Sequence, residues 1–97
     1  MLKRIGTLVM VVFLFSFFIS GCHYFSAKKE IANAEKLLSE LKGAGGDKKA
    51  PYEYCSAEKF LEGARLEFSQ NDFGPAKALA DRSTAAAQAG LVEVKKK

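Results

Sequence analysis

The sequence predicts an all-α protein in which a cleaved N-terminal signal segment precedes a small three-helix bundle whose last two helices form an antiparallel hairpin. Three observations lead to this fold class. Apolar residues recur at helical spacing in three stretches of the chain. Gly-rich and polar residues separate these stretches at positions 43–50 and 69–72. The first 21 residues differ in composition, since a basic start leads into a long apolar run.

The N-terminal segment is typical of an export signal. Lys3 and Arg4 precede an apolar run over residues 5–19, and small residues close it. A charged start, a short apolar stretch and a small-residue exit together indicate a signal peptide. The alternative is a membrane anchor that is not cut, but a spanning helix needs about 20 predominantly apolar residues. The run approaches that length only if Lys3 and Arg4 are counted, so we favour the cleaved signal.

The segment ends with Ile19-Ser20-Gly21-Cys22, which resembles the lipobox of bacterial lipoprotein signal peptides. In that family the Cys thiol receives a diacylglyceryl group as a thioether, a peptidase cuts before the Cys, and the new amino group is usually acylated. The resemblance implies cleavage between Gly21 and Cys22, with acyl chains such as palmitate on Cys22. Residues 1–21 are then the lipoprotein signal peptide.

A lipidated tether, residues 22–29, is expected to lead into the helical domain. Tyr24 and Phe25 suit the headgroup layer of a membrane, where aromatic rings are enriched. Lys28 and Lys29 follow and favour anionic lipid, or they are simply the first turn of a solvated helix. In the lipoproteins that the signal resembles, an Asp after the lipidated Cys retains the protein in the inner membrane. His23 stands there instead, so we expect a bacterial outer-membrane location facing the periplasm.

The remaining chain is small and nearly neutral. Removing the signal takes away two basic residues and no acidic one, so the formal charge falls from +4 to +2. The basic pI therefore gives little reason to expect nucleic acid as a partner. A chain of this length forms one domain at most, here residues 30–97. Domains below about 70–80 residues rarely gain more than a few kcal/mol from one core, so we expect support from oligomerisation, a partner or the membrane.

The first helix is expected over residues 26–42. Ser26 is a suitable N-cap. The run Gly43-Ala44-Gly45-Gly46 ends the helix, because glycine tolerates the left-handed conformation that closes helices, and a polar loop follows. The apolar face is expected to consist of Ala27, Ile31, Ala34, Leu38 and Leu41, with Leu37 at its edge.

The second helix is expected over residues 52–69. Pro51 suits its first turn, where a missing N–H costs nothing. Gly63 costs about 1 kcal/mol relative to Ala in mid-helix, which a close approach of another helix would offset. The main apolar face is Tyr54, Ala57, Leu61, Ala64 and Phe68, flanked by Phe60.

A weaker apolar strip lies on the other side of this helix and is formed by Tyr52, Cys55 and Leu66, which we name the outer strip. It is a candidate surface for a protein partner, and so is the groove left open by the hairpin. Cys55 has no internal disulfide partner if Cys22 is a thioether. It either forms an intermolecular bridge in a compartment that favours disulfides or, as we prefer, is a small apolar filler shielded from oxidant.

The third helix is expected over residues 73–94, with Asp72 as N-cap and Pro75 in the first turn. Its apolar side chains are mostly small, so a neighbouring helix can pack closely. Lys95-Lys96-Lys97 suit a helix C-terminus and form either a solvated end, which we favour, or a docking patch. The apolar face is Phe73, Ala76, Ala80, Ser83, Ala87, Leu91 and Val94.

A resemblance rests on Ala50-Pro51-Tyr52-Glu53, Ala57-Glu58-Lys59-Phe60-Leu61 and Asn71-Asp72-Phe73, together with regularly placed Ala residues. These residues are similar to a domain of unknown function in small bacterial envelope lipoproteins. The resemblance covers residues 31–90 and implies an Ala-rich helical hairpin, which is also similar to a single tetratricopeptide-type unit. Some members of that family are fused to OmpA-like peptidoglycan-binding domains. The resemblance does not cover such a domain, so it does not imply peptidoglycan binding here. It implies no catalytic residue.

The residues of catalysis are missing from the expected domain. The single His, His23, lies beside Cys22, so no Ser/His/Asp set and no Cys/His metal site is expected. The paired carboxylates Glu58 and Glu62 are expected on an exposed helix face, where Lys59 compensates Glu58 and Arg65 compensates Glu62. We therefore predict a non-enzymatic protein without cofactor, metal, nucleic acid or small-molecule substrate. It would be a lipid-anchored interaction or assembly module of the envelope, or alternatively a self-oligomerising spacer, possibly linked through Cys55.

Overall fold

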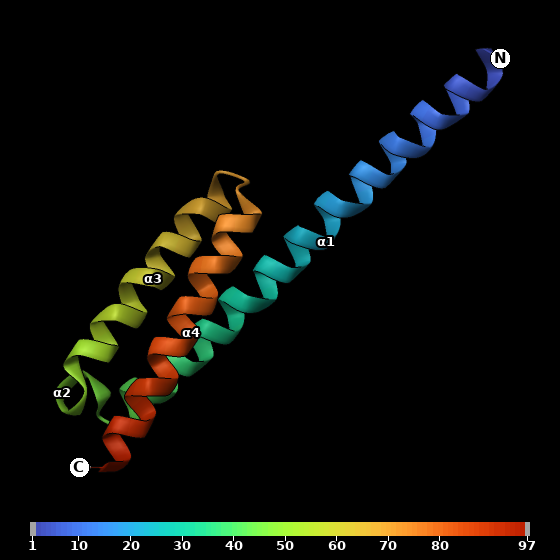
Figure 1. The fold of residues 1–97 in the computed structure, drawn as a ribbon. Helices are drawn as coiled ribbons and strands as arrows, with labels where there is room; N and C mark the ends of the chain where they lie inside the picture. Colours follow the sequence, from blue (N-terminus) through green and yellow to red (C-terminus); the bar gives the residue numbers. More distant parts are fainter. Residues whose placement is uncertain (1, 97) are drawn as a thin grey trace.

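The computed structural model describes the backbone of residues 2–96 and the side chains of residues 4–14 and 23–96. Its helices are, in order, α1 (Leu2–Gly43), α2 (Gly46–Lys49), α3 (Pro51–Ser69) and α4 (Phe73–Lys96) (Figure 1). The described backbone contains helices and turns but no strand, which confirms the all-α class.

The C-terminal part of α1 packs with α3 and α4, while its N-terminal part projects away from them (Figure 1). The chain reverses at residues 70–72, so α4 runs back along α3. Helix α4 packs extensively against both α1 and α3, whereas α1 and α3 touch each other less. The projecting part of α1 gives the molecule its extents of 70 × 21 × 15 Å.

The expected start of the first helix at Ser26 is wrong, because α1 is continuous from Leu2 to Gly43. Residues 2–25 contain no proline, and extending an existing helix is far easier than nucleating one. The expected tether, residues 22–29, is therefore helical. Ala27, which belongs to this segment, is fully buried in the bundle, so the chain enters the domain as a continuous helix. The polar loop expected after residue 46 also contains a short helix, α2.

The apolar faces expected for the three long helices form the core. Two clusters of buried side chains each draw residues from α1, α3 and α4. Small residues dominate, so the helices approach closely and the core contains few large side chains. The buried apolar residues of the three helices are Ala27, Ile31, Ala34 and Leu41, then Ala57, Leu61 and Ala64, then Ala76, Ala80 and Ala87.

Glycines let the helices meet at two places. Leu41 is fully buried, and a Cβ added to Gly90 of α4 would lie 2.7 Å from its Cδ2. A Cβ added to Gly46 at the start of α2 would also collide with the Leu41 side chain. The close approach expected at Gly63 is confirmed, since a Cβ there would lie 3.2 Å from Leu79 Cδ1 on α4.

One buried polar contact joins α3 and α4. The Ser83 hydroxyl is fully buried and donates a hydrogen bond to the backbone carbonyl of Ala57, with an Oγ–O distance of 2.7 Å. Because burying an unpaired hydroxyl is costly, this bond accounts for a Ser on an otherwise apolar face.

Candidate functional site

The predicted lipidation and cleavage residues, Cys22 and Gly21, lie within the helical backbone of α1. Their side chains fall in the stretch 15–22, outside the side chains that the structure describes. Lipidation of Cys22 therefore remains a prediction from the sequence.

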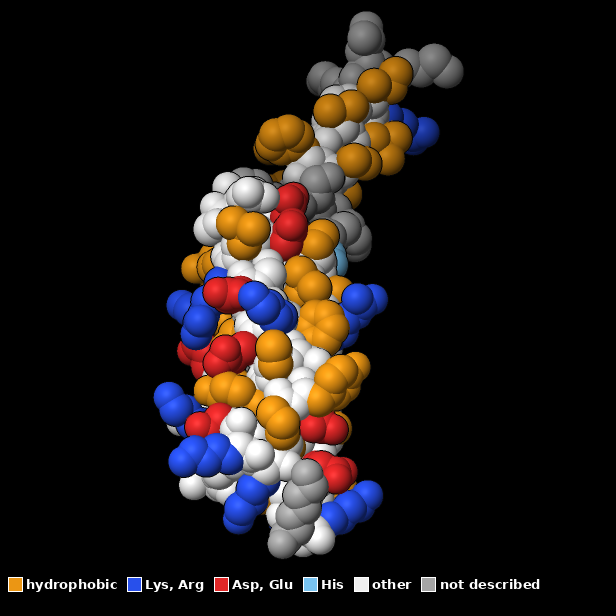
Figure 2. Space-filling view, turned by 90° about the vertical axis from the view of Figure 1, so that its left-hand side faces the viewer, with side chains coloured by type: hydrophobic (Ala, Val, Ile, Leu, Met, Phe, Trp, Pro, Cys, Tyr) orange, Lys and Arg blue, Asp and Glu red, His pale blue; other side chains and the backbone are white. Residues whose placement is uncertain are grey.

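The projecting part of α1 exposes all the large apolar side chains that the structure describes between residues 5 and 14. We name this segment of α1, residues 5–14, the apolar rod. Exposed fractions run from 53% for Val11 to 74% for Phe13. Figure 2 shows apolar side chains on the visible sides of the rod, whereas apolar and charged side chains alternate over the bundle. A search of the described residues found no helix with the length and apolarity needed to cross a membrane. The rod nonetheless presents a contiguous apolar surface that water solvates poorly.

Four aromatic rings gather where α1 enters the bundle, and we name them the aromatic end. The rings of Tyr24, Phe68 and Phe73 lie with centroids 5.3 Å apart in each pair. Phe25 stacks edge-on against Tyr24 at 5.4 Å but is 70% exposed. Sequence reasoning placed Phe68 and Phe73 in the core and Tyr24 and Phe25 in a tether. It missed their meeting because that depends on how three helices align.

The groove expected to be left open by α3 and α4 is largely filled, since the apolar face of α1 packs into it. A shallow groove remains between α1 and α3, with a volume of about 250 Å³. The groove is lined by Glu35, Leu38, Ser39, Lys42, Tyr54, Leu61 and Arg65. Burial is the main cause that raises the pKa of Tyr54 in this lining, and the negative charge of Glu58 is the second.

An ion pair crosses this groove. Arg65 donates from Nε and Nη2 to Oε1 of Glu35 on α1, at 3.2 and 2.8 Å. The sequence had suggested that Arg65 compensates Glu62 within its own helix. Glu62 instead lies 4.0 Å from Lys59. Both pairs are substantially exposed, and exposed pairs contribute about 0–1 kcal/mol.

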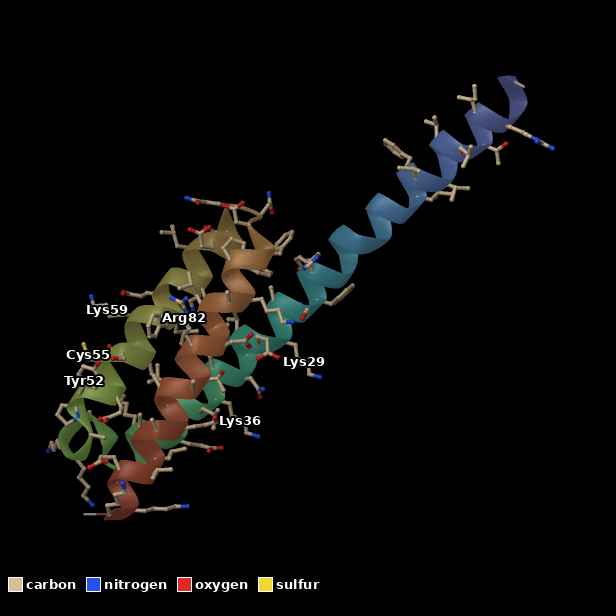
Figure 3. The ribbon with its side chains drawn as sticks, in the orientation of Figure 1. Lys29, Lys36, Tyr52, Cys55, Lys59 and Arg82 are labelled. Atoms are coloured by element: carbon tan, nitrogen blue, oxygen red, sulfur yellow. The ribbon has the colours of Figure 1, made fainter. Side chains whose placement is uncertain are left out.

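The outer strip lies on the solvent side of α3. Tyr52 is 79% exposed and Leu66 57% exposed, and Cys55 is a free, exposed thiol. Figure 3 shows Tyr52 and Cys55 pointing away from the bundle. The expectation that Cys55 is a shielded apolar filler is therefore wrong, because α1 and α4 both pack on the opposite face of α3.

Two pairs of carboxyl groups lie close together. A hydrogen bond with Asp81 of α4, together with partial burial, raises the pKa of Glu30 on α1. At the α3–α4 turn, burial and then a hydrogen bond with Asp72 raise the pKa of Glu67. Sequence reasoning considered only Glu58 and Glu62 as paired carboxylates. Those two are exposed, as expected.

Among the described side chains, no group of three or more His, Cys, Asp or Glu residues is placed to hold a metal ion. His23 is exposed at the base of the bundle, and Lys95 and Lys96 are exposed at the end of α4. The surfaces that stand out are therefore the apolar rod, the aromatic end, the groove between α1 and α3, and the outer strip.

Comparison with known proteins gives no assignment, since no family model, no curated protein and no solved structure matches this chain.

Proposed function

We propose that this chain is a lipid-anchored protein of the bacterial cell envelope that acts as a non-catalytic helical interaction or assembly module. The observation that carries the proposal is the apolar rod. Large apolar side chains more than half exposed over a whole helical segment imply a surrounding other than water. Membrane insertion during export supplies one, and the Ile19-Ser20-Gly21-Cys22 motif at the end of the apolar run accounts for its later removal.

Cleavage before Cys22 would discard residues 1–21 and leave a bundle of three long helices, with α3 and α4 as its hairpin. Anchoring then depends on the acyl chains of Cys22. Each buried CH₂ group contributes about 0.8 kcal/mol, so two or three chains hold a protein durably where one chain does not. With His23 rather than Asp after the Cys, we propose the outer membrane as the location, facing the periplasm.

Two surfaces support an interaction role. The groove between α1 and α3 offers apolar and charged side chains, and a helix laid along it would displace the exposed ion pair between Arg65 and Glu35. The outer strip offers exposed Tyr52 and Leu66, which lie on the side of α3 opposite the core.

A second function is favoured by one observation, the exposure of the Cys55 thiol. In an oxidising compartment an exposed, otherwise unpaired thiol can join two copies of a protein. The alternative proposal is thus a self-oligomerising spacer of the envelope that is linked through Cys55.

The anchor is tested by metabolic labelling with a clickable palmitate analogue in a bacterial host. The chain supplies its own matched control, since it has two cysteines. We expect Cys22→Ser to abolish labelling and Cys55→Ser to leave it unchanged. Intact mass measurement should give a chain that starts at residue 22 with added acyl mass. Labelling that persists in Cys22→Ser, or an intact N-terminus without acyl mass, would refute the anchor.

The module and the spacer are separated by the size of the purified lipoprotein in detergent micelles. The spacer predicts a covalent dimer that reductant or Cys55→Ser converts to monomer. The module predicts a monomer under both conditions, with in-cell crosslinks from position 52 to another protein. A monomer insensitive to reductant contradicts the spacer, and crosslinks solely between copies of this chain contradict the module.

A further inference from the structure

We infer that the aromatic end is a membrane-contact surface: Tyr24, Phe25, Phe68 and Phe73 lie in the headgroup layer of the bilayer. The bundle then stands end-on, with the α3–α4 turn against the membrane and α2 at the far end. This inference deepens the proposed function and rests on it for the presence of a membrane.

The direction of the membrane follows from the course of α1. The apolar rod leaves the bundle at the aromatic end (Figure 1). If the rod is retained, the apolar phase that accepts it lies at this end. If the chain is cut before Cys22, the acyl chains are attached three residues before Phe25, which is about 4.5 Å of helix at 1.5 Å per residue. Both cases place the bilayer beside the same rings.

The α3–α4 turn reaches the same level as the start of the bundle. Phe68 in the last turn of α3 and Phe73 at the first residue of α4 both contact Tyr24, with ring centroids 5.3 Å apart. The turn therefore cannot lie far from the anchor. Because α1 is helical through this region and Ala27 is buried, no flexible linker allows the bundle to swing away.

Exposure of Phe25 indicates that the aromatic end is not only a core. Burying an aromatic side chain is worth about 1.5–3 kcal/mol, yet Phe25 contacts the other rings through Tyr24 and remains 70% exposed. Aromatic side chains are enriched at the level of lipid headgroups. A bilayer surface would cover Phe25 without any change in the fold.

The charges around this end define which side lies deeper. Lys28 and Lys29 are exposed on α1, one turn beyond Phe25, and each can gain about 1 kcal/mol near anionic lipid. Glu67 and Asp72 lie at the turn and oppose such lipid, although burial and then the hydrogen bond with Asp72 raise the pKa of Glu67. We expect the α1 side to lie closer to the headgroups than the turn.

The experiment uses the purified full lipoprotein in vesicles of phosphatidylethanolamine and phosphatidylglycerol, three to one. A Cys55→Ser background leaves each introduced cysteine as the only free thiol for the environment-sensitive dye NBD. Labels are placed by Gln70→Cys at the turn, by Asp47→Cys on α2 and by Tyr52→Cys on the outer strip, all exposed positions. Quenching by nitroxide-headgroup lipid reports proximity to the membrane surface.

We expect quenching at position 70 to be several-fold stronger than at positions 47 and 52. Phe25→Ser should reduce it, while Val92→Ser, which removes an apolar side chain 55% exposed on α4, should not. Equal quenching at positions 70 and 47 would overturn the inference, and so would strongest quenching at position 52, which indicates a bundle lying flat. The acyl mass measured on the same sample separates the two proposals. A lipidated, vesicle-bound protein without quenching at position 70 overturns the membrane contact of the aromatic end alone. A sample without acyl mass overturns the lipid anchor.

Discussion

Replacing Gly90 with alanine tests how closely α4 packs on α1. An added Cβ would lie 2.7 Å from Leu41 Cδ2, 3.0 Å from Leu41 Cδ1 and 3.2 Å from Glu53 Cβ. These atoms belong to two different helices, and Leu41 is fully buried, so the side chain has no free space into which to move. A contact this short forces a shift of the helices or of the Leu41 rotamer.

The magnitude follows from two opposing effects. Overpacking a filled core costs about 1–3 kcal/mol. Replacing glycine by alanine within a helix gains up to about 1 kcal/mol. We therefore expect Gly90→Ala to lower the free energy of unfolding by roughly 0–2 kcal/mol. Gly74→Ala in the first turn of the same helix is the matched control, since nothing lies within 4 Å of a Cβ there.

The comparison of these two variants isolates the cost of the contact. Urea unfolding of the purified protein, followed by circular dichroism, gives both free energies of unfolding. We expect Gly74→Ala to be more stable than Gly90→Ala by roughly 1–3 kcal/mol, the overpacking cost alone. If Gly90→Ala is as stable as Gly74→Ala, the packing of Leu41 against α4 is looser than described and the reasoning fails.

Three further changes test the contacts between helices. Ser83→Ala should cost about 1 kcal/mol, because it removes a buried hydrogen bond, and Ser69→Ala, which removes an exposed one, should cost less in the same urea titration. Arg65→Ala should change the free energy of unfolding by about 0–1 kcal/mol, and a larger loss would mean that its pair with Glu35 is less solvated than its exposure implies. Lowering the pH from 7 toward 5 should stabilise the fold through Glu30. The pKa of Glu30 is raised in the folded state, so the folded protein binds a proton at a higher pH than the unfolded chain does. This gain in the free energy of unfolding is lost as the pH rises through the folded-state pKa. Glu30→Gln should flatten this trend between pH 5 and 7, and an unchanged slope would contradict the assignment.

The local pattern of the sequence predicts the helices that pack and the faces that they bury. The limits of α3 and α4 lie within one or two residues of those expected, because Pro51 suits a first helical turn and the polar residues 70–72 form the turn between the two helices. Ala57, Leu61 and Ala64 are buried as their spacing predicts. Periodicity succeeds here because a helix in a bundle buries one stripe.

The same local pattern does not determine contacts between distant segments. The pairing of Arg65 with Glu35 and the meeting of Tyr24 with Phe68 depend on how α1 aligns with α3, which no short-range signal encodes. The start of α1 was misplaced for a related reason: Ser26 is a good cap, but a cap does not interrupt a helix that already extends through it. The exposure of Cys55 likewise depends on which side of α3 receives α1.

Small and aromatic side chains are distributed differently along the bundle. Small residues fill the interior, so close backbone approach stabilises the bundle more than large apolar side chains do. The aromatic rings concentrate instead at the end where the chain enters, and Ala27 is buried only five residues after Cys22. If Cys22 carries the proposed anchor, the continuous helix α1 joins that anchor to the packed helices without an intervening loop. For a small domain whose core alone supplies a few kcal/mol, the membrane contact that we propose for the aromatic end would then add to the stability of the fold.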